Sequence, residues 1–242
     1  MIKINNISKS YKTYTVPLNS LKSFLINLKE YKKQTNKIKV LNVIKNFSIE
    51  IAEGEILGII GPNGVGKSTL AKLIAGTVSP DVGEIITKGR IVPFLELGVA
   101  FSSELTAKDN VFLNGVLLGL SLKYIKENFN KIFEFAEVQD FIDTPLKYFS
   151  SGMQMRLAFS IAMHANGDIF IFDEILAVGD SNFQKKCFNS FHNLIEQKKT
   201  IIMIMHDLEF LKKYADKILQ LKKSGSYELF EDKNEIAELN SD

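Results

Sequence analysis

One eight-residue run constrains the fold of this chain more than any other feature of its sequence. The run is Gly61-Pro-Asn-Gly-Val-Gly66-Lys67-Ser68; the apolar segment Glu55–Ile60 precedes it, and a helical pattern over Ser68–Ala75 follows. This strand, loop and helix order is typical of a P-loop, in which glycines turn backbone N–H groups toward one point and the helix N-terminus adds positive partial charge. We therefore predict a phosphate site, with the Lys67 amine on the β and γ phosphates and the Ser68 hydroxyl on Mg²⁺. The predicted nucleotide-binding residues of this loop are Gly61, Pro62, Asn63, Gly64, Val65, Gly66, Lys67, Ser68 and Thr69.

A second signal is the acidic end of an apolar run, Asp168-Ile-Phe-Ile-Phe-Asp173-Glu174. An apolar strand that ends at Asp173 places this carboxylate at the carboxyl edge of a sheet, where ligands of open α/β sheets bind. We predict that Asp173 is associated with Mg²⁺ and that Glu174 is catalytic, polarising the water that attacks the γ-phosphate.

The spacing of apolar residues predicts an α/β fold. Continuous apolar runs at 168–172 and 200–205 suit strands of a parallel sheet that is covered on both faces. Helical spacing recurs between the strands, so strands and helices alternate along the chain. The expected strands also include 47–52 and 55–60, separated by a turn at Glu53-Gly54, and the expected helices are 107–120, 122–137 and 152–165.

Composition excludes several classes of protein. The 242 residues include 30 Lys and Arg and 28 Asp and Glu, 45% are hydrophobic, and one is cysteine. These values argue against a disordered chain, a disulfide framework and a nucleic-acid binder that relies on bulk positive charge, and they fit a reducing cytoplasm. The sequence contains no secretory signal and no apolar stretch of the roughly 18–20 residues that a membrane span needs.

The segment Pro17–Lys39 has a different composition from the rest of the chain. Six lysines stand there against Glu30 alone, and six apolar residues recur three and four positions apart. This pattern predicts an amphipathic basic helix. Two interpretations stay open: the helix packs on its own domain, or it docks on a membrane surface or a membrane partner.

A third motif lies between the first two, at Tyr148-Phe-Ser-Ser151-Gly152-Met-Gln154. Ser151 and Gly152 precede a helical run, which predicts a helix N-cap. In the order P-loop, this motif, acidic strand end, the segment resembles the signature motif of ABC-type ATPases. It departs from the usual LSGGQ at Ser150 and Met153. In that family the signature helix of one subunit faces the γ-phosphate held by the P-loop of the other.

The resemblance implies roles for further residues. Asp180 in Ala-Val-Gly-Asp looks like the acidic member of the D-loop, His206 looks like the catalytic switch histidine, and Tyr11 occupies the place of the aromatic that stacks on adenine. His164 and His192 have no such context and are expected to be structural. The family's Q-loop glutamine is missing, and Glu96 is the nearest polar residue; a carboxylate could not simply replace an amide beside phosphate.

The segments LELG, YFSSGMQMRLAFSIA and DEILAVGDSNFQKKC together are similar to one ABC branch, the ATP-binding subunits that export O-antigen, capsule or teichoic-acid chains. The resemblance implies a RecA-like P-loop core, an N-terminal antiparallel β layer and a helical subdomain at about 95–166, all in a single domain, 1–242. It also implies ATP and Mg²⁺ as cofactors and a homodimer bound to an integral membrane permease at the cytoplasmic face of the membrane. No nucleic-acid partner is expected, and because the chain ends in a short acidic tail, no carbohydrate-binding module is expected either.

Three alternatives remain at this point. The chain could be a soluble ABC ATPase acting on nucleic acid or the ribosome, or an ABC ATPase that serves a different transported substrate. It could also be a P-loop kinase or GTPase, although the SSGMQ segment and His206 argue against that class.

Overall fold

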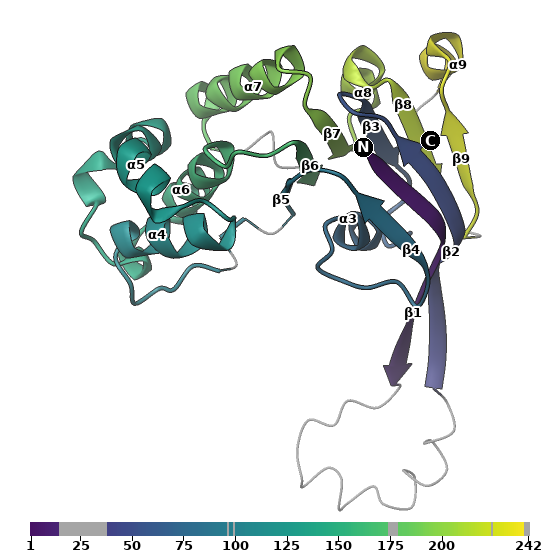
Figure 1. Ribbon diagram of the computed structural model, residues 1–242, viewed down its shortest axis with the longest axis horizontal. Coiled ribbons are helices and arrows are strands. Elements are labelled where there is room, and N and C mark those ends of the chain that lie inside the picture. Colours follow the sequence, from purple (N-terminus) through teal and green to yellow (C-terminus); the bar gives the residue numbers. More distant parts are fainter. Residues whose placement is uncertain (15–37, 96, 99, 174–178, 224, 240–242) are drawn as a thin grey trace, which may run out of the picture.

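The computed structural model describes residues 1–14, 38–95, 97–98, 100–173, 179–223 and 225–239. Figure 1 shows a central sheet with an antiparallel sheet beside it and a group of helices that extends away to the other side. The prediction of an α/β fold with an N-terminal antiparallel layer and a helical part is confirmed.

The antiparallel layer contains three strands in the order β2-β1-β4. Their bounds are Ile2–Tyr14 for β1, Ile38–Ile51 for β2 and Val82–Thr87 for β4. The predicted strand at 47–52 is therefore only the end of a much longer one, because β2 pairs with β1 along its whole length, from Ile51 opposite Ile2 to Ile38 opposite Tyr14. The last two residues of the predicted basic helix, 38 and 39, belong to β2, and the rest of that helix lies outside the described residues.

The central sheet has six strands in the order β5-β6-β7-β3-β8-β9. The first five are parallel, and β9 at the edge is antiparallel to β8. Their bounds are β3 Ile56–Ile60, β5 Ile91–Phe94, β6 Ile169–Asp173, β7 Thr200–Ile204, β8 Lys217–Leu221 and β9 Tyr227–Phe230.

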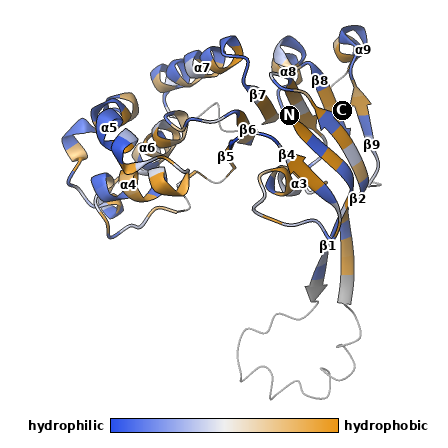
Figure 2. Ribbon diagram, in the orientation of Figure 1, coloured by the Kyte–Doolittle hydropathy of each residue, from blue (hydrophilic) through white to orange (hydrophobic). Residues whose placement is uncertain are grey.

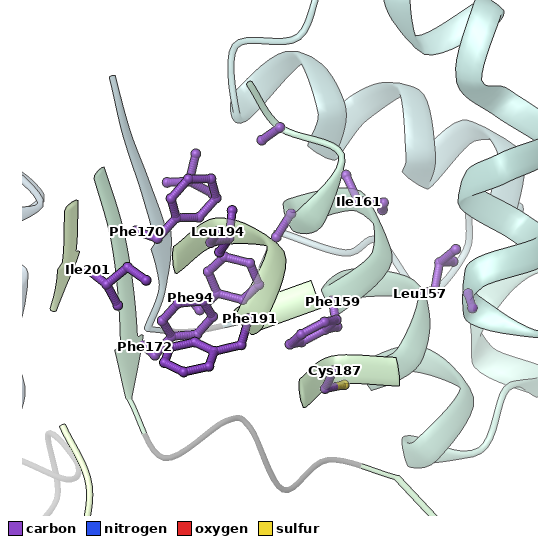
Figure 3. Packing of buried hydrophobic residues seen from close by; sticks show 14 of the residues in the cluster. Phe94, Leu157, Phe159, Ile161, Phe170, Phe172, Cys187, Phe191, Leu194 and Ile201 are labelled. Atoms are coloured by element: carbon purple, nitrogen blue, oxygen red, sulfur yellow. The ribbon is translucent and has the colours of Figure 1, made fainter. Parts of the chain in front are cut away.

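Alternate residues of the central strands enter two different hydrophobic clusters. In β6, Phe170 and Phe172 join the cluster on the helical side, whereas Ile169 and Ile171 join the cluster beneath the antiparallel layer. This period-2 sorting is expected of a strand covered on both faces. Figure 3 shows the aromatic side, where the Phe94 and Phe172 rings stack with centroids 4.6 Å apart and Phe191 lies against them. In Figure 2, β7 of the central sheet is coloured as hydrophobic, whereas α5 is mainly hydrophilic.

The helices divide between the two faces of the sheet. Helix α3 (Lys67–Ile74) packs in the cluster under the antiparallel layer. On the opposite face lie α4 (Ala107–Leu117), α5 (Leu122–Ala136), α6 (Ser151–Met163), α7 (Ser181–Glu196) and α8 (Leu208–Tyr214), and α9 (Lys233–Glu238) follows β9. Two 3₁₀ turns, Gln139–Phe141 and Leu146–Tyr148, join α5 to α6. Among the described helices none has the length and apolar composition of a membrane span.

Helix ends differ from the predicted ends for local reasons. The predicted helix 107–120 ends at Leu117, because Gly119 adopts a left-handed conformation with φ 77°. The predicted helix 122–137 ends one residue early, since Glu137 is its left-handed C-cap with φ 58°. Left-handed residues are the common way in which helices stop.

Candidate functional site

The loop between β3 and α3 has the backbone geometry of a phosphate cradle. Gly61 and Gly66 have φ values of 141° and 116°, which L side chains rarely adopt. A Cβ at Gly61 would come within 2.5 Å of the Leu221 carbonyl oxygen, and one at Gly66 within 2.5 Å of a Val43 methyl. Gly66 is also the N-cap of α3 and provides no side-chain cap. The first-turn N–H groups of α3 are thus available to an anion.

Lys67 is folded back over this loop. Its side chain is buried, with 7% of the residue exposed, and its Nζ donates hydrogen bonds to the carbonyls of Gly61 at 2.6 Å and Pro62 at 3.4 Å. The next residue, Ser68, is exposed at the start of α3. The Lys67 ammonium group thus lies on the backbone of the loop itself. Phosphate oxygens bound there would be stronger acceptors than the two carbonyls.

Strand register brings the predicted chemical groups to one edge of the central sheet. Asp173 lies opposite Ile204 of β7, and Ile204 lies opposite Ile59 of β3. Gly61 follows Ile59 by two residues and His206 follows Ile204 by two. The P-loop, Asp173 and His206 thus leave the sheet at the same level, and Asp173 is half-buried while His206 is exposed. Glu174 follows Asp173 directly and lies outside the described residues, as does Glu96.

The start of α6 corrects the predicted N-cap. The cap is Ser150, whose Oγ accepts the backbone N–H of Met153 at 3.2 Å, and not Ser151 or Gly152. An N-cap oxygen accepts the N–H two or three residues further on, so the bond from Met153 to Ser150 makes Ser151 the first helical residue, one residue earlier than predicted. Ser151 and Gly152 are the first helical residues, and both are exposed.

The described fold separates Ser151 and Gly152 from the P-loop. Helix α6 packs on the helical face of the central sheet and α3 packs on the opposite face. The Gln154 side chain holds the start of α6 on its own layer by donating to the carbonyls of Leu146 at 3.0 Å and Phe149 at 3.4 Å.

Asp180 caps α7 and faces α6. Its Oδ1 accepts the N–H groups of Asn182 and Phe183, each at 3.0 Å, and these hydrogen bonds lower the pKa of the Asp180 carboxyl below its ordinary value. Its other oxygen lies 3.7 Å from Nη1 of Arg156 on α6. The predicted D-loop residue is therefore ionised at neutral pH and lies beside the helix that begins with Ser151.

Tyr11 lies on the antiparallel layer next to the strand that covers the P-loop. It is 38% exposed and pairs with Leu41 of β2, the strand whose Val43 contacts Gly66. The two residues before Tyr11 are held by Asp81, whose carboxylate accepts hydrogen bonds from Lys9 Nζ at 2.8 Å and from the Ser10 N–H at 2.7 Å. These contacts lower the pKa of Asp81 to about 2 and fix β1 next to Tyr11. Sequence reasoning missed Asp81, because a contact across some seventy residues leaves no local signal.

The two histidines expected to be structural lie apart from this edge. His164 ends α6, its Nδ1 is 2.8 Å from the Ser160 carbonyl, and burial lowers its pKa. His192 on α7 lies 3.3 Å from the Tyr214 hydroxyl. The single cysteine, Cys187, is fully buried in the aromatic cluster (Figure 3), and burial raises the pKa of its thiol to about 12.

Comparisons with known proteins identify the family of this chain. The family model described as ABC transporter matches residues 44–177. The chain is 36% identical over 233 residues to the O-antigen export system ATP-binding protein RfbB of Klebsiella pneumoniae, with 94% of each chain covered. It is 39% identical over 222 residues to the teichoic acids export ATP-binding protein TagH of Bacillus anthracis, covering 91% of this chain and 39% of that protein.

Other relatives are longer, and a solved structure shares the fold. The chain spans 65% and 50% of the length of two further curated relatives. An ATP-binding cassette solved as a dimer in a post-hydrolysis state with ADP and Pi superposes with a TM-score of 0.71 at 23% identity. That match covers 94% of this chain and 98% of the cassette, and it shows that the fold is the same.

Proposed function

This chain belongs to the ABC transporter family, and we propose that it hydrolyses ATP to power the export of a lipid-linked polysaccharide through a separate membrane permease. The observation that carries the ATPase part is the strand register, which aligns Gly61, Asp173 and His206 at one edge of the sheet. The export part is supported by the relatives, which are named as export subunits for O-antigen and teichoic acids.

The proposed roles of the residues follow from their chemistry. The P-loop residues 61–69 hold the phosphates, with Lys67 as the cation that leaves the Gly61 carbonyl for phosphate oxygens. Ser68 and Asp173 offer a hydroxyl and a carboxylate, the hard oxygen ligands that Mg²⁺ takes together with phosphate and water. Glu174 activates the attacking water, and His206 contacts the γ-phosphate. Tyr11 stacks on adenine.

We further propose that two copies of the chain form the complete site. Ser151 and Gly152 begin a helix on the face of the sheet opposite α3, so packing within one chain does not bring them to the P-loop of that chain. Across a dimer, the first turn of α6 and Asp180 would complete the partner's site. Closure on ATP would then bias the permease between two states. The permease places the chain at the cytoplasmic face of the membrane.

The test of the ATPase role is the Glu174→Gln variant. Loss of the carboxylate removes general-base assistance, so kcat falls by about 10²-fold or more while ATP binding persists. The bound ATP is then not consumed, and light scattering after size-exclusion chromatography shows a dimer in the presence of ATP and Mg²⁺. The matched control is Glu196→Gln, an exposed carboxylate at the end of α7, which leaves kcat within about twofold. Normal hydrolysis by Glu174→Gln would remove Glu174 from its role, and absence of ATP binding by the wild type would remove the function.

The transported substrate needs a test in cells. Replacement of the chromosomal copy with Glu174→Gln should deplete polysaccharide at the cell surface and accumulate its lipid-linked form on the cytoplasmic side. Unchanged surface polysaccharide would leave the ATPase intact and overturn the export role. Copurification of the chain with RNA rather than an integral membrane protein would instead favour a nucleic-acid partner.

A further inference from the structure

The use of arginine in this chain is selective. Of the 30 Lys and Arg residues, Arg90 and Arg156 are the only arginines. A lysine supplies a point charge, whereas the planar guanidinium supplies several donors in fixed directions and stacks on aromatic rings. The other 28 cationic residues are lysines, so the contacts of the two arginines are the places at which a role for a planar cation can be sought.

Each arginine links separate elements of the fold. Arg90 precedes β5, and its Nη2 donates to the carbonyl of Gly119, which follows α4. Arg156 lies on α6, five residues after Ser151, and its Nη1 faces Asp180 at the start of α7. The first contact involves none of the proposed nucleotide residues, and the second involves one of them, Asp180.

Arg156 is shared between two carboxylates. Its Nη1 is 3.3 Å from Oε2 of Glu137 and 3.7 Å from Oδ2 of Asp180, and only 19% of its side chain is exposed. The guanidinium carbon lies 6.0 Å from the centre of the Phe183 ring. One nitrogen thus faces carboxylates at the end of α5 and the start of α7, while the guanidinium lies by the Phe183 ring, where a planar group can stack and the compact ammonium of lysine cannot.

Glu137 anchors this arrangement. It is the left-handed C-cap of α5, and while Oε2 faces Arg156, Oε1 accepts a hydrogen bond from Lys186 on α7. Glu137 therefore ties α5 to both α6 and α7 without Asp180. The ion pairs of Glu137 can thus be removed while the contact between Arg156 and Asp180 is kept.

The guanidinium is not fully satisfied. Its Nε is buried and, within the part of the chain that the structure describes, has no hydrogen-bond partner. An unsatisfied buried donor costs free energy. The buried Nε is therefore a cost to stability and takes no part in the ion pairs of this cluster.

Building on the proposed function, we propose that Arg156 is a positioning residue of the ATPase: it sets the first turn of α6, with Ser151 and Gly152, relative to Asp180. Helix α6 transmits the position of Arg156 to Ser151 over five residues of continuous backbone hydrogen bonding. Because the composite site requires Ser151 and Asp180 to reach the same partner chain together, their relative placement limits the rate of turnover and not the binding of ATP to the P-loop.

The experiment compares three conservative variants in the full chain. Arg156→Lys keeps the charge and loses the planar group, so kcat falls about tenfold while the KM for ATP stays within about twofold. Glu137→Gln removes two ion pairs and keeps the Arg156–Asp180 contact, so the melting temperature falls while kcat stays within about twofold. Arg90→Lys is the matched control, the same substitution at the other arginine, and leaves kcat within about twofold.

The pattern across the variants decides the role. If the loss of kcat follows the loss of melting temperature in all three, Arg156 is merely structural and the proposal is overturned. An Arg156→Lys variant with wild-type kcat also overturns it, while the proposed function stands. A wild-type chain that does not hydrolyse ATP would overturn the proposed function and, with it, this inference.

Discussion

In the chain without nucleotide, the Lys67 ammonium is hydrogen-bonded to backbone carbonyls, and the proposed phosphate ligand would compete with them for it. Lys67 is buried with its ammonium on the Gly61 carbonyl. Lys67→Met keeps the length of the side chain and removes the charge, so the affinity for ATP should fall at least about tenfold, the usual size of a lost charge-assisted hydrogen bond. Titration with a fluorescent ATP analogue measures this change.

The same variant should not destabilise the nucleotide-free chain, because it removes the cost of burying an ammonium group. The melting temperature without ATP is therefore expected to be equal or higher. Lys88→Met, at an exposed site after β4, is the control for affinity. Unchanged ATP binding by Lys67→Met would show that its ammonium is not on the phosphates.

Individual functional residues can be predicted from the sequence when they lie next to one another in the chain. The P-loop was identifiable because its glycines, lysine and serine lie within eight residues. Ser150 and Ser151 are adjacent, and the sequence alone does not say which of them starts the helix. Asp81 has no local signature, since its partners Lys9 and Ser10 come from another strand.

The first turn of α6 separates a folding role from a functional role in two neighbouring serines. Ser150→Ala removes the N-cap hydrogen bond to Met153, which costs about 1 kcal/mol and lowers the melting temperature by about 2–4 °C. Ser151→Ala removes an exposed hydroxyl that caps nothing, so the melting temperature should not change.

For dimerisation, we expect the larger effect from Ser151→Ala and the smaller effect from Ser150→Ala. In the Glu174→Gln background with ATP, Ser151→Ala is expected to weaken the dimer about tenfold, because a hydrogen bond to a charged phosphate is lost. Ser150→Ala should leave the dimer dissociation constant within about twofold. Sedimentation equilibrium measures both, and equal effects of the two substitutions would refute the assignment of Ser151.

Whole elements were predictable where apolar spacing is continuous, as in β6, β7 and α5. The strand order was not, because β6 and β3 are separated by β7, which comes later in the chain than both. Likewise β2 extends back to Ile38 only because β1 offers a partner over that length. Such pairings depend on contacts between distant residues and not on local pattern.

At the scale of the whole molecule, ligand binding and folding stability are linked. ATP that binds the folded Glu174→Gln chain at 100 times its dissociation constant should stabilise it by about 2.7 kcal/mol, a rise in melting temperature of about 5–10 °C. Differential scanning fluorimetry with ATP and Mg²⁺ measures the rise. The double variant Lys67→Met, Glu174→Gln should show a much smaller rise at the same ATP concentration, and an equal rise would place the nucleotide elsewhere on the chain.

The alternation of Phe and Ile along β6 has a consequence for catalysis. A slip of β6 by one residue would turn Phe170 and Phe172 toward the antiparallel layer and Ile171 toward the helices, exchanging side chains of different volume between two closely packed interiors. The same slip would move Asp173 off the level of Ile204 and Ile59. Misalignment of the carboxylate therefore carries a packing penalty, and the bulk of the buried Phe170 and Phe172 rings protects the reaction against an error of one residue.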